Sequence, residues 1–424
     1  MQQNISLEKS WSYFVLSILF LSFYYLSYRY PLQMNSSDTS QTYSDTTFIF
    51  QFGKYVIFAG LLFILILFLL KLRPTVEIKK KTMLELFIAL FLFVMPMAQF
   101  SLSLNDWVLQ TGLFFILLVL FYMFPFKRID YKRVSRAIMI FVVIAIIVEI
   151  YQLANFFING RLPALGYAGT ISVRFGSIWD DPNAFALVLP LLMPYIWKSE
   201  LRLSFKVIIQ VALAITLAFT QSLTGIAALI VAVVFGVFFM FFIDKRRSHI
   251  KTFLMFAVVL SIMFSGFKIY VQPSEFYETY MALKEGSIEG HKVGFLSLDD
   301  ADAAHFLGFN PQPHGKYAET GYINLLLNFG IFYTAGFLIL GLTTIWRLAV
   351  FIKNNRNKKY IEIFYGAFFF VISFYVSLAN LPVEVIFPLN LLLVICIMIS
   401  YADPLTEERE EKVKRKRKRY RLTW

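Results

Sequence analysis

Polar residues that could do chemistry gather directly before one of the hydrophobic segments of this chain. The stretch 174–184 combines Arg174, Asp181 and Asn183 with a glycine and a proline in otherwise apolar surroundings. Polar residues at the mouth of a membrane span are costly to keep there, so they usually have a function. The guanidinium of Arg174 stays charged, and its planar fork fits the oxygens of a diphosphate. Pairing of Arg174 with Asp180 or Asp181 is the structural alternative.

The order of Asp181, Pro182 and Asn183 is typical of a helix start. Asp and Asn are favoured at the N-cap, and Pro is favoured in the first turn. Capping is one sufficient explanation of these residues. A helix N-terminus that points away from the cytoplasm would also add to an anion site, so Asp181 and Asn183 are candidate substrate-binding residues.

A second polar stretch, 313–330, leads into a later hydrophobic segment. Either His314 or Glu319 could take a proton from a sugar hydroxyl if burial brings its pKa close to neutrality. The structural alternatives are a hydrogen-bonded loop histidine and a glutamate that interacts with the positive end of a helix dipole. Lys316 and Tyr322 are further candidates for binding substrate.

The composition of the chain indicates a membrane protein. Of its 424 residues, 58% are hydrophobic and 16% are charged, and the mean hydropathy is +0.65. Soluble domains are about half apolar and about a quarter charged. A membrane helix needs about 20 mostly apolar residues, which predicts an all-α, polytopic fold of about twelve spans. We place them at 11–28, 47–70, 83–100, 107–126, 137–157, 183–198, 206–221, 224–243, 251–270, 321–346, 361–379 and 385–401.

Basic residues alternate along the predicted loops. Lys and Arg gather after the even-numbered spans, and short loops rich in these residues stay in the cytoplasm. We therefore expect both termini in the cytoplasm. The formal net charge of +13 follows from this topology. The basic tail, 402–424, is expected to lie on anionic lipid, and binding of RNA by the tail is the alternative.

We expect one membrane domain, 1–424, with a folded outer loop at 271–320 between spans nine and ten. Neither a metal nor another cofactor is expected. His291, His305 and His314 match no compact metal-ligand pattern, and the sequence contains no P-loop. The single cysteine, Cys396, lies in a hydrophobic run, which indicates inert packing.

Together with this topology, three motifs resemble the O-antigen polymerase and O-antigen ligase superfamily of bacterial polysaccharide assembly. The motifs are Arg174-x-Gly176 followed by Asp181-Pro182-Asn183-Ala184, then Thr220-Gln221-Ser222-x-Thr224-Gly225, and then Glu319-x-Gly321-Tyr322-Ile323 before Leu325-Leu326-x-x-x-Gly330. The resemblance implies a glycosyltransferase in the bacterial cytoplasmic membrane, with its active site on the outer face. A polyprenyl-diphosphate-linked oligosaccharide would be both donor and acceptor, and a chain-length regulator and a flippase are candidate partners.

The family's functional residues map onto this chain with one departure. Arginines hold the diphosphate in the family, which points to Arg174 and Arg161 here. The position that matches the ligase histidine is Glu319, and His314 lies earlier in the chain. This departure favours polymerisation of repeat units into capsule, O-antigen or exopolysaccharide, and it leaves the base open between Glu319 and His314.

Two other classes of function compete with a polymerase. A ligase would transfer finished polysaccharide to a lipid or another acceptor. A flippase or transporter would place ionisable residues near the middle of the membrane. In this chain Lys54, Glu149 and Lys268 fall toward the outer ends of predicted spans, and Glu85 falls toward an inner end. This distribution favours chemistry at an interface over transport, and a purely structural assembly partner is a further alternative.

Overall fold

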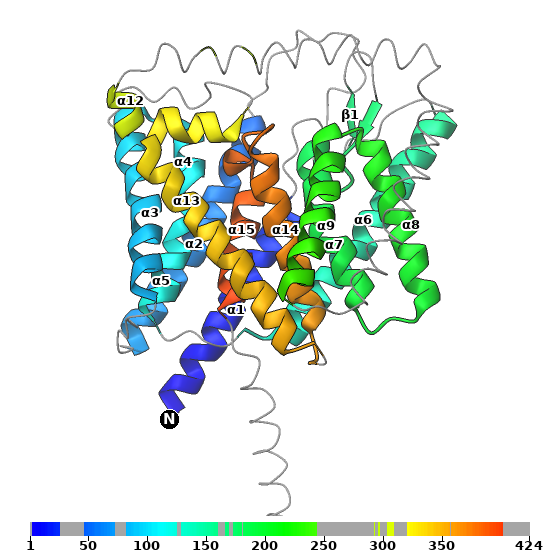
Figure 1. Cartoon of the computed structure of the whole chain (residues 1–424), viewed down its shortest axis with the longest axis horizontal. Helices are drawn as coiled ribbons and strands as arrows, with labels where there is room; N and C mark the ends of the chain where they lie inside the picture. The colour runs from blue at the N-terminus through cyan, green and yellow to red at the C-terminus, as the bar shows by residue number, and fades with distance from the viewer. Residues whose placement is uncertain are drawn as a thin grey trace, which may run out of the picture.

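The chain folds into a bundle of helices with one short β-hairpin (Figure 1). The computed structural model describes residues 2–25, 46–72, 82–124, 129–159, 166–168, 173–179, 181–243, 292, 296, 303–308, 320–356 and 358–401. The predicted ninth span, 251–270, and the basic tail, 402–424, lie outside these residues, as does most of the loop 271–320.

The helices match most of the predicted apolar segments. The first half of the chain contains α1 (Gln2–Tyr24), α2 (Thr46–Leu72), α3 (Met83–Ser103), α4 (Asp106–Gly112), η2 (Leu113–Phe115), α5 (Ile116–Met123), α6 (Tyr131–Asn159), β1 (Gly166–Ala168), β2 (Val173–Phe175) and α7 (Pro182–Lys198). The second half contains α8 (Leu203–Thr220), α9 (Leu223–Ile243), α12 (Ala303–Leu307), α13 (Gly321–Asn354), α14 (Ile361–Ser377), η4 (Val383–Val385) and α15 (Leu389–Ser400).

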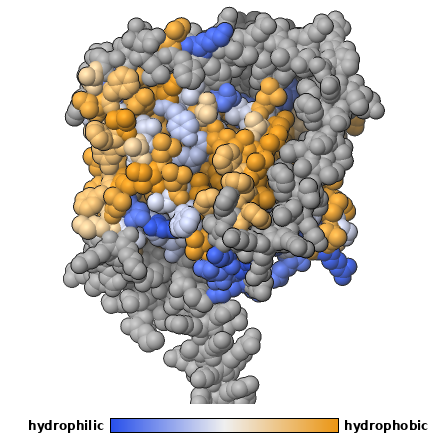
Figure 2. Space-filling model, in the orientation of Figure 1, coloured by the Kyte–Doolittle hydropathy of each residue, from blue (hydrophilic) through white to orange (hydrophobic). Residues whose placement is uncertain are grey.

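The bundle has the composition of a polytopic membrane protein. Six of the described helices are long and apolar enough to cross a bilayer, namely α2, α3, α6, α8, α9 and α13. Large apolar side chains on α2 point outward, with Phe63 60% exposed and Leu70 66% exposed. Apolar residues cover the middle of the face shown in Figure 2, and hydrophilic residues gather at its lower rim. This surface confirms the prediction of a membrane-embedded helical protein.

The centre of the bundle is formed by α7, α14 and α15. Almost every residue of α14 and α15 is buried, as expected for helices that are apolar on all sides. A Cβ atom at Gly366 would lie 2.7 Å from the backbone oxygen of Leu191, so α14 and α7 approach closely at this point. Their packing therefore depends on a glycine in the contact.

Helix α13 contains the predicted span at 321–346 and bends at Gly330. Gly330 has φ 82° and ψ 177°, a conformation that is open to glycine alone. A Cβ atom there would clash with the backbone of Gly308, which follows α12. The first part of α13 consequently runs across one end of the bundle, and the rest descends through it (Figure 1).

Two further differences concern short elements. The predicted loop at 158–182 contains the antiparallel pair β1–β2, so the fold is helical but not purely so. The predicted span at 107–126 is divided into α4, η2 and α5. Both differences arise from local changes in backbone hydrogen bonding. A hydropathy pattern does not predict such changes.

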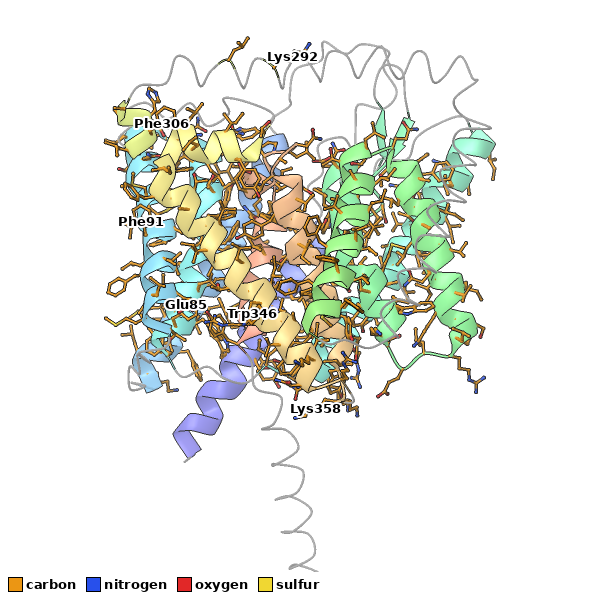
Figure 3. The ribbon with its side chains drawn as sticks, in the orientation of Figure 1. Glu85, Phe91, Lys292, Phe306, Trp346 and Lys358 are labelled. Carbon is orange, nitrogen blue, oxygen red and sulfur yellow. The ribbon has the colours of Figure 1, made fainter. Side chains whose placement is uncertain are left out.

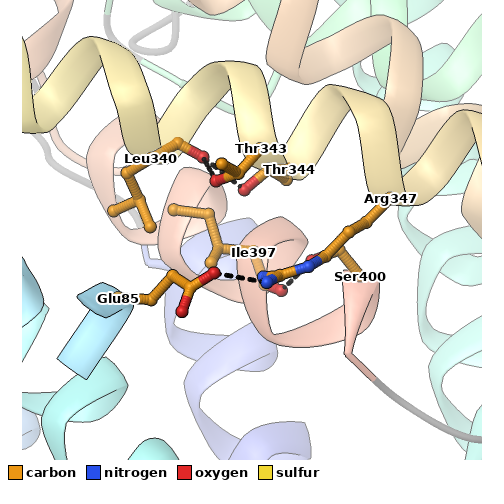
Figure 4. A network of polar contacts seen from close by, with 7 residues as sticks. All are labelled: Glu85, Leu340, Thr343, Thr344, Arg347, Ile397 and Ser400. Atoms are coloured by element: carbon orange, nitrogen blue, oxygen red, sulfur yellow. Dashed lines mark hydrogen bonds and ion pairs between the residues drawn. The ribbon is translucent and has the colours of Figure 1, made fainter. Parts of the chain in front are cut away.

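An ion pair joins α3 to α13 at the end of the bundle opposite the bend (Figure 4). The guanidinium of Arg347 donates a hydrogen bond to the carboxylate of Glu85. The Cζ atom of Arg347 also lies 3.9 Å from the ring centroid of Tyr401, directly after α15. Arg347 thus connects three segments, and the Glu85 carboxylate, with 9% of its side chain exposed, has a partner for its charge.

Candidate functional site

Helix α7 begins as the sequence predicts. Asp181 is the N-cap, and its Oδ1 atom accepts a hydrogen bond of 2.8 Å from the backbone N–H of Asn183. Pro182 occupies the first helical position, where its missing N–H costs nothing. The capping role of this motif is therefore confirmed. Its role in binding an anion stays a prediction.

The segment before α7 is held tightly between α6 and α1. The backbone N–H of Trp179 donates to the oxygen of Gly176 at 3.0 Å, which closes a turn directly after β2. The Trp179 Nε1–H donates to the backbone oxygen of Phe23 in α1 at 3.3 Å. The Ser177 hydroxyl donates to the backbone oxygen of Ala145 in α6 at 2.7 Å. These contacts position the backbone of β2, in which Arg174 is paired with Tyr167.

The second sequence motif packs on α7 where α9 begins. A Cβ atom at Gly225, in the first turn of α9, would clash with the Cβ atom of Ala186 in α7. The hydroxyl of Ser222 accepts a hydrogen bond of 3.1 Å from the backbone N–H of Gly225 and caps this helix. The motif 220–225 therefore packs against the helix that Asp181 starts.

The third motif starts α13 and is fastened to α14. The hydroxyl of Tyr322 donates to the backbone oxygen of Tyr375 at 2.6 Å, and its backbone N–H donates to the oxygen of Leu378 at 3.3 Å. Tyr322 is half-buried. Its hydroxyl proton is therefore used for structure, and the role of Tyr322 in binding substrate stays a prediction.

Residues 378–388, which we name the α14–α15 connector, link the second and third motifs. The amide of Asn380 donates a hydrogen bond to the hydroxyl of Thr224 in the second motif. The backbone of Leu378 accepts from Tyr322 in the third motif. On its other side, the amide of Asn390, just beyond the connector, donates to the backbone oxygen of Gln110 at 3.0 Å. The starts of α7, α9 and α13 thus lie at one end of the bundle, which we name the motif end.

A buried carboxyl group lies in this connector. Glu384 is 2% exposed, and neither of its oxygens has a hydrogen-bond partner among the described residues. Its Oε2 atom lies 2.5 Å from the position that a Cβ atom would take at Gly321. Burial raises the pKa of Glu384 to about 8. A carboxyl group near neutral pKa, against the third motif, can both hold and release a proton under physiological conditions.

Two further buried polar groups lie near the same helix starts. The hydroxyl of Thr320, which is 4% exposed at the N-cap of α13, has no hydrogen-bond partner within the described part of the chain. Glu149 in α6, one turn from the Ala145 oxygen that binds Ser177, is 2% exposed, and its two oxygens likewise lack a described partner. Buried polar groups of this kind are uncommon and often mark sites that bind or move protons.

The other predicted site residues fall outside the described part of the structure. Arg161, His314, Lys316 and Glu319 lie there, and only the backbone of Arg174 is described. Glu319 directly precedes Thr320 in the chain. Among the described residues, no group of three His, Cys, Asp or Glu side chains could hold a metal ion.

Sequence reasoning did not single out Glu384, although a signal was present. It is the one acid in the short break between the last two predicted spans, with Pro382 before it and Pro388 after it. The comparisons with known proteins provide no further guidance: no family model, no curated protein and no solved structure matches this chain.

Proposed function

We propose that this protein polymerises lipid-linked oligosaccharide repeat units by glycosyl transfer from a polyprenyl diphosphate donor. The product would be a capsular polysaccharide, an O-antigen or an exopolysaccharide. One observation carries the proposal: the second and third motifs, far apart in the sequence, meet at a connector with a buried carboxyl group, and the second motif packs on the helix that the first motif starts. Inert structural motifs would have no need of a buried carboxyl group that lacks a partner among the described residues.

The proposal includes a topology of about twelve spans in the bacterial cytoplasmic membrane, with the motif end outside. The contacts of Phe121 support the inner placement of both termini. Trp11 near the start of α1 and Tyr401 after α15 both pack on its ring, at centroid distances of 6.1 and 5.9 Å. The described chain therefore starts and finishes at the same end of the bundle, as an even number of spans requires. The abundance of Lys and Arg in the loops of that end supports its cytoplasmic position.

In the proposed reaction, a sugar hydroxyl of one lipid-linked repeat attacks the anomeric carbon of the other. A new glycosidic C–O bond forms, and the C–O bond to the diphosphate breaks. Arg174, with Arg161, stabilises the charge that develops on the leaving diphosphate. The donor is already activated, so the transfer needs no nucleotide.

The proton of the attacking hydroxyl passes to Glu319 or His314. Glu384 lies against Gly321 in the same motif, and burial raises its pKa to about 8. Its carboxyl group therefore carries a proton near neutral pH and cannot take a second one from the reaction. In this scheme Glu384, which is 2% exposed, is a positioning residue for the start of α13.

Deletion of the gene in its native host, with surface glycan resolved by size, tests the proposed function. Single repeats on the surface lipid in place of long chains are the expected result. A ladder of unchanged chain length would exclude a polymerase. Polymer that accumulates on the carrier lipid would instead identify a ligase.

A further inference from the structure

One amide side chain in α3 holds two other parts of the backbone together. The Nε2 group of Gln99 donates a hydrogen bond of 2.6 Å to the backbone oxygen of Asn328 in α13. The same group donates a second hydrogen bond, of 3.4 Å, to the backbone oxygen of Gly308, directly after α12. Gln99 therefore joins α3, α12 and α13. Figure 3 shows this corner of the bundle, with Phe306 of α12 above α3.

The orientation of the Gln99 amide follows from its partners. Both partners are carbonyl oxygens, which can only accept hydrogen bonds, so the amide nitrogen must face them. An amide nitrogen has two N–H donors, one for each acceptor. Gln99 is 5% exposed, and burial of an amide without hydrogen bonds is costly. The two donated bonds offset this cost.

The two acceptors lie where the backbone departs from regular geometry. Gly308 and Gly330 have φ values of 83° and 82°, and a Cβ atom at Gly308 would clash with the backbone oxygen of Phe329. Met95, one turn before Gln99 in α3, lies 3.1 Å from the same position. Carbonyl groups beside a break in a helix need donors from outside the helix. Gln99 supplies such a donor on both sides of this close backbone contact.

The clasped backbone adjoins the segment that contains both candidate bases. Gly308 directly precedes 309–319, and Thr320, the N-cap of α13, directly follows this segment. His314 and Glu319 lie within it in the sequence. A contact that fixes Gly308 relative to the first part of α13 therefore fixes the two points to which this segment is attached.

We propose that Gln99 is a positioning residue for the glycosyl transfer. Its amide holds Gly308 against α13 and thereby restrains both ends of 309–319. The inference rests on the function proposed above, because Gln99 acts through the base in that segment and touches no substrate. A displacement of reacting groups by about 1 Å can lower a rate about 10²-fold, even when the mutated residue is far from the reaction.

Variants of Gln99 test this role in the purified full-length protein. The substrate is the lipid-linked single repeat extracted from the deletion strain. Gln99→Glu keeps the shape of the side chain and lacks the Nε2 donors, and Gln99→Leu lacks every polar atom. Gln99→Asn, with an amide that is one methylene group shorter, serves if neither of these folds. The matched control is Gln210→Leu, because Nε2 of Gln210 in α8 also donates to a backbone oxygen at 2.6 Å, that of Met193.

The Gln99 variants are expected to lower kcat about 10²-fold and to leave KM unchanged, since the contact acts on the reacting group and not on the binding of substrate. Gln210→Leu should leave both constants unchanged. An equal loss of kcat in Gln99→Leu and Gln210→Leu would overturn the positioning role, because any loss of a buried amide would then have the same effect. A rise of KM alone in the Gln99 variants would overturn it as well.

Hydrogen–deuterium exchange separates this inference from the proposed function, because it needs neither substrate nor activity. Backbone amides of 303–308 and 320–330 should exchange faster in the Gln99 variants than in the wild type, and at the wild-type rate in Gln210→Leu. Unchanged exchange in the Gln99 variants would overturn the inference. Absence of glycosyl transfer by the wild type would overturn the proposed function, and the positioning role with it, whatever the exchange rates.

Discussion

The Oε2 atom of Glu384 lies 2.5 Å from the point where Gly321 would carry a Cβ atom. A connector between the last two helices therefore touches the first turn of α13, which is far from it in the sequence. The closeness explains why the motif has glycine at this position. It also places a buried carboxyl group against the first turn of α13, which follows Glu319 in the chain.

Substitution of Gly321 by Ala is expected to displace the connector. The added methyl group would meet the Glu384 carboxylate and, at 2.6 Å, the Cδ2 atom of Leu378. Overpacking of this kind costs about 1–3 kcal/mol of stability. Thermal unfolding in detergent measures the loss of stability, and polymer length in cells measures the effect on the proposed activity. Gly60→Ala is the matched control, since no atom lies within 4 Å of a Cβ there, and equal losses in both variants would contradict the contact.

The stability of the wild type is expected to fall as pH rises between 4.5 and about 8, the ordinary and folded pKa values of Glu384. Within this window the unfolded chain releases the proton and the folded chain keeps it, so the folded state loses up to about 1.4 kcal/mol per pH unit. The Glu384→Gln variant has no carboxyl group at this position, so its stability lacks this dependence on pH.

Unfolding of both proteins across that pH range measures the difference. The variant should gain stability relative to the wild type as pH rises, and the difference should level off above about pH 8. Two parallel pH profiles would contradict a buried carboxyl group of raised pKa at this position.

Arg174→Ala is expected to abolish polymer without lowering the amount of protein in the membrane. The variant lacks the guanidinium that we propose to stabilise the leaving diphosphate. Loss of one such stabilising donor lowers the rate by a factor of about 10²–10³. Glycan size and immunoblotting of membranes are the measurements. Arg133→Ala is the control because Arg133 lies in an ion pair of 3.0 Å with Asp130, with 46% of its side chain exposed. Retained polymer in Arg174→Ala would leave that arginine a structural role.

Gly330→Ala should destabilise the protein, whereas Gly336→Ala in the same helix should not. Gly330 has φ 82°, and a methyl group there would also lie 2.7 Å from the backbone carbon of Leu307. Such a backbone conformation costs a non-glycine residue about 1–3 kcal/mol. At Gly336 the nearest neighbour is 3.5 Å away, and alanine is favoured over glycine in a helix by about 1 kcal/mol. We expect Gly330→Ala to lower the unfolding temperature and Gly336→Ala to raise it. Equal shifts in the two variants would contradict the bend at Gly330.

The sequence by itself predicts the features that depend on neighbouring residues. The free energy of transferring a segment into a bilayer is a sum over its own side chains. A membrane-embedded helical protein therefore follows from hydropathy alone. The cap formed by Asp181 for Asn183 is likewise local, and it appears in the structure as predicted. The span expected over 321–346 lies within α13, but its bend at Gly330 does not follow from the sequence, because it depends on a contact with Gly308.

Only the tertiary structure decides which distant residues meet. Asn380 reaches Thr224, and Glu384 reaches Gly321, because the packing of α14 against α7, α9 and α13 places the connector at the motif end. Such contacts depend on the shapes of many side chains at once, and no short stretch of sequence contains that information.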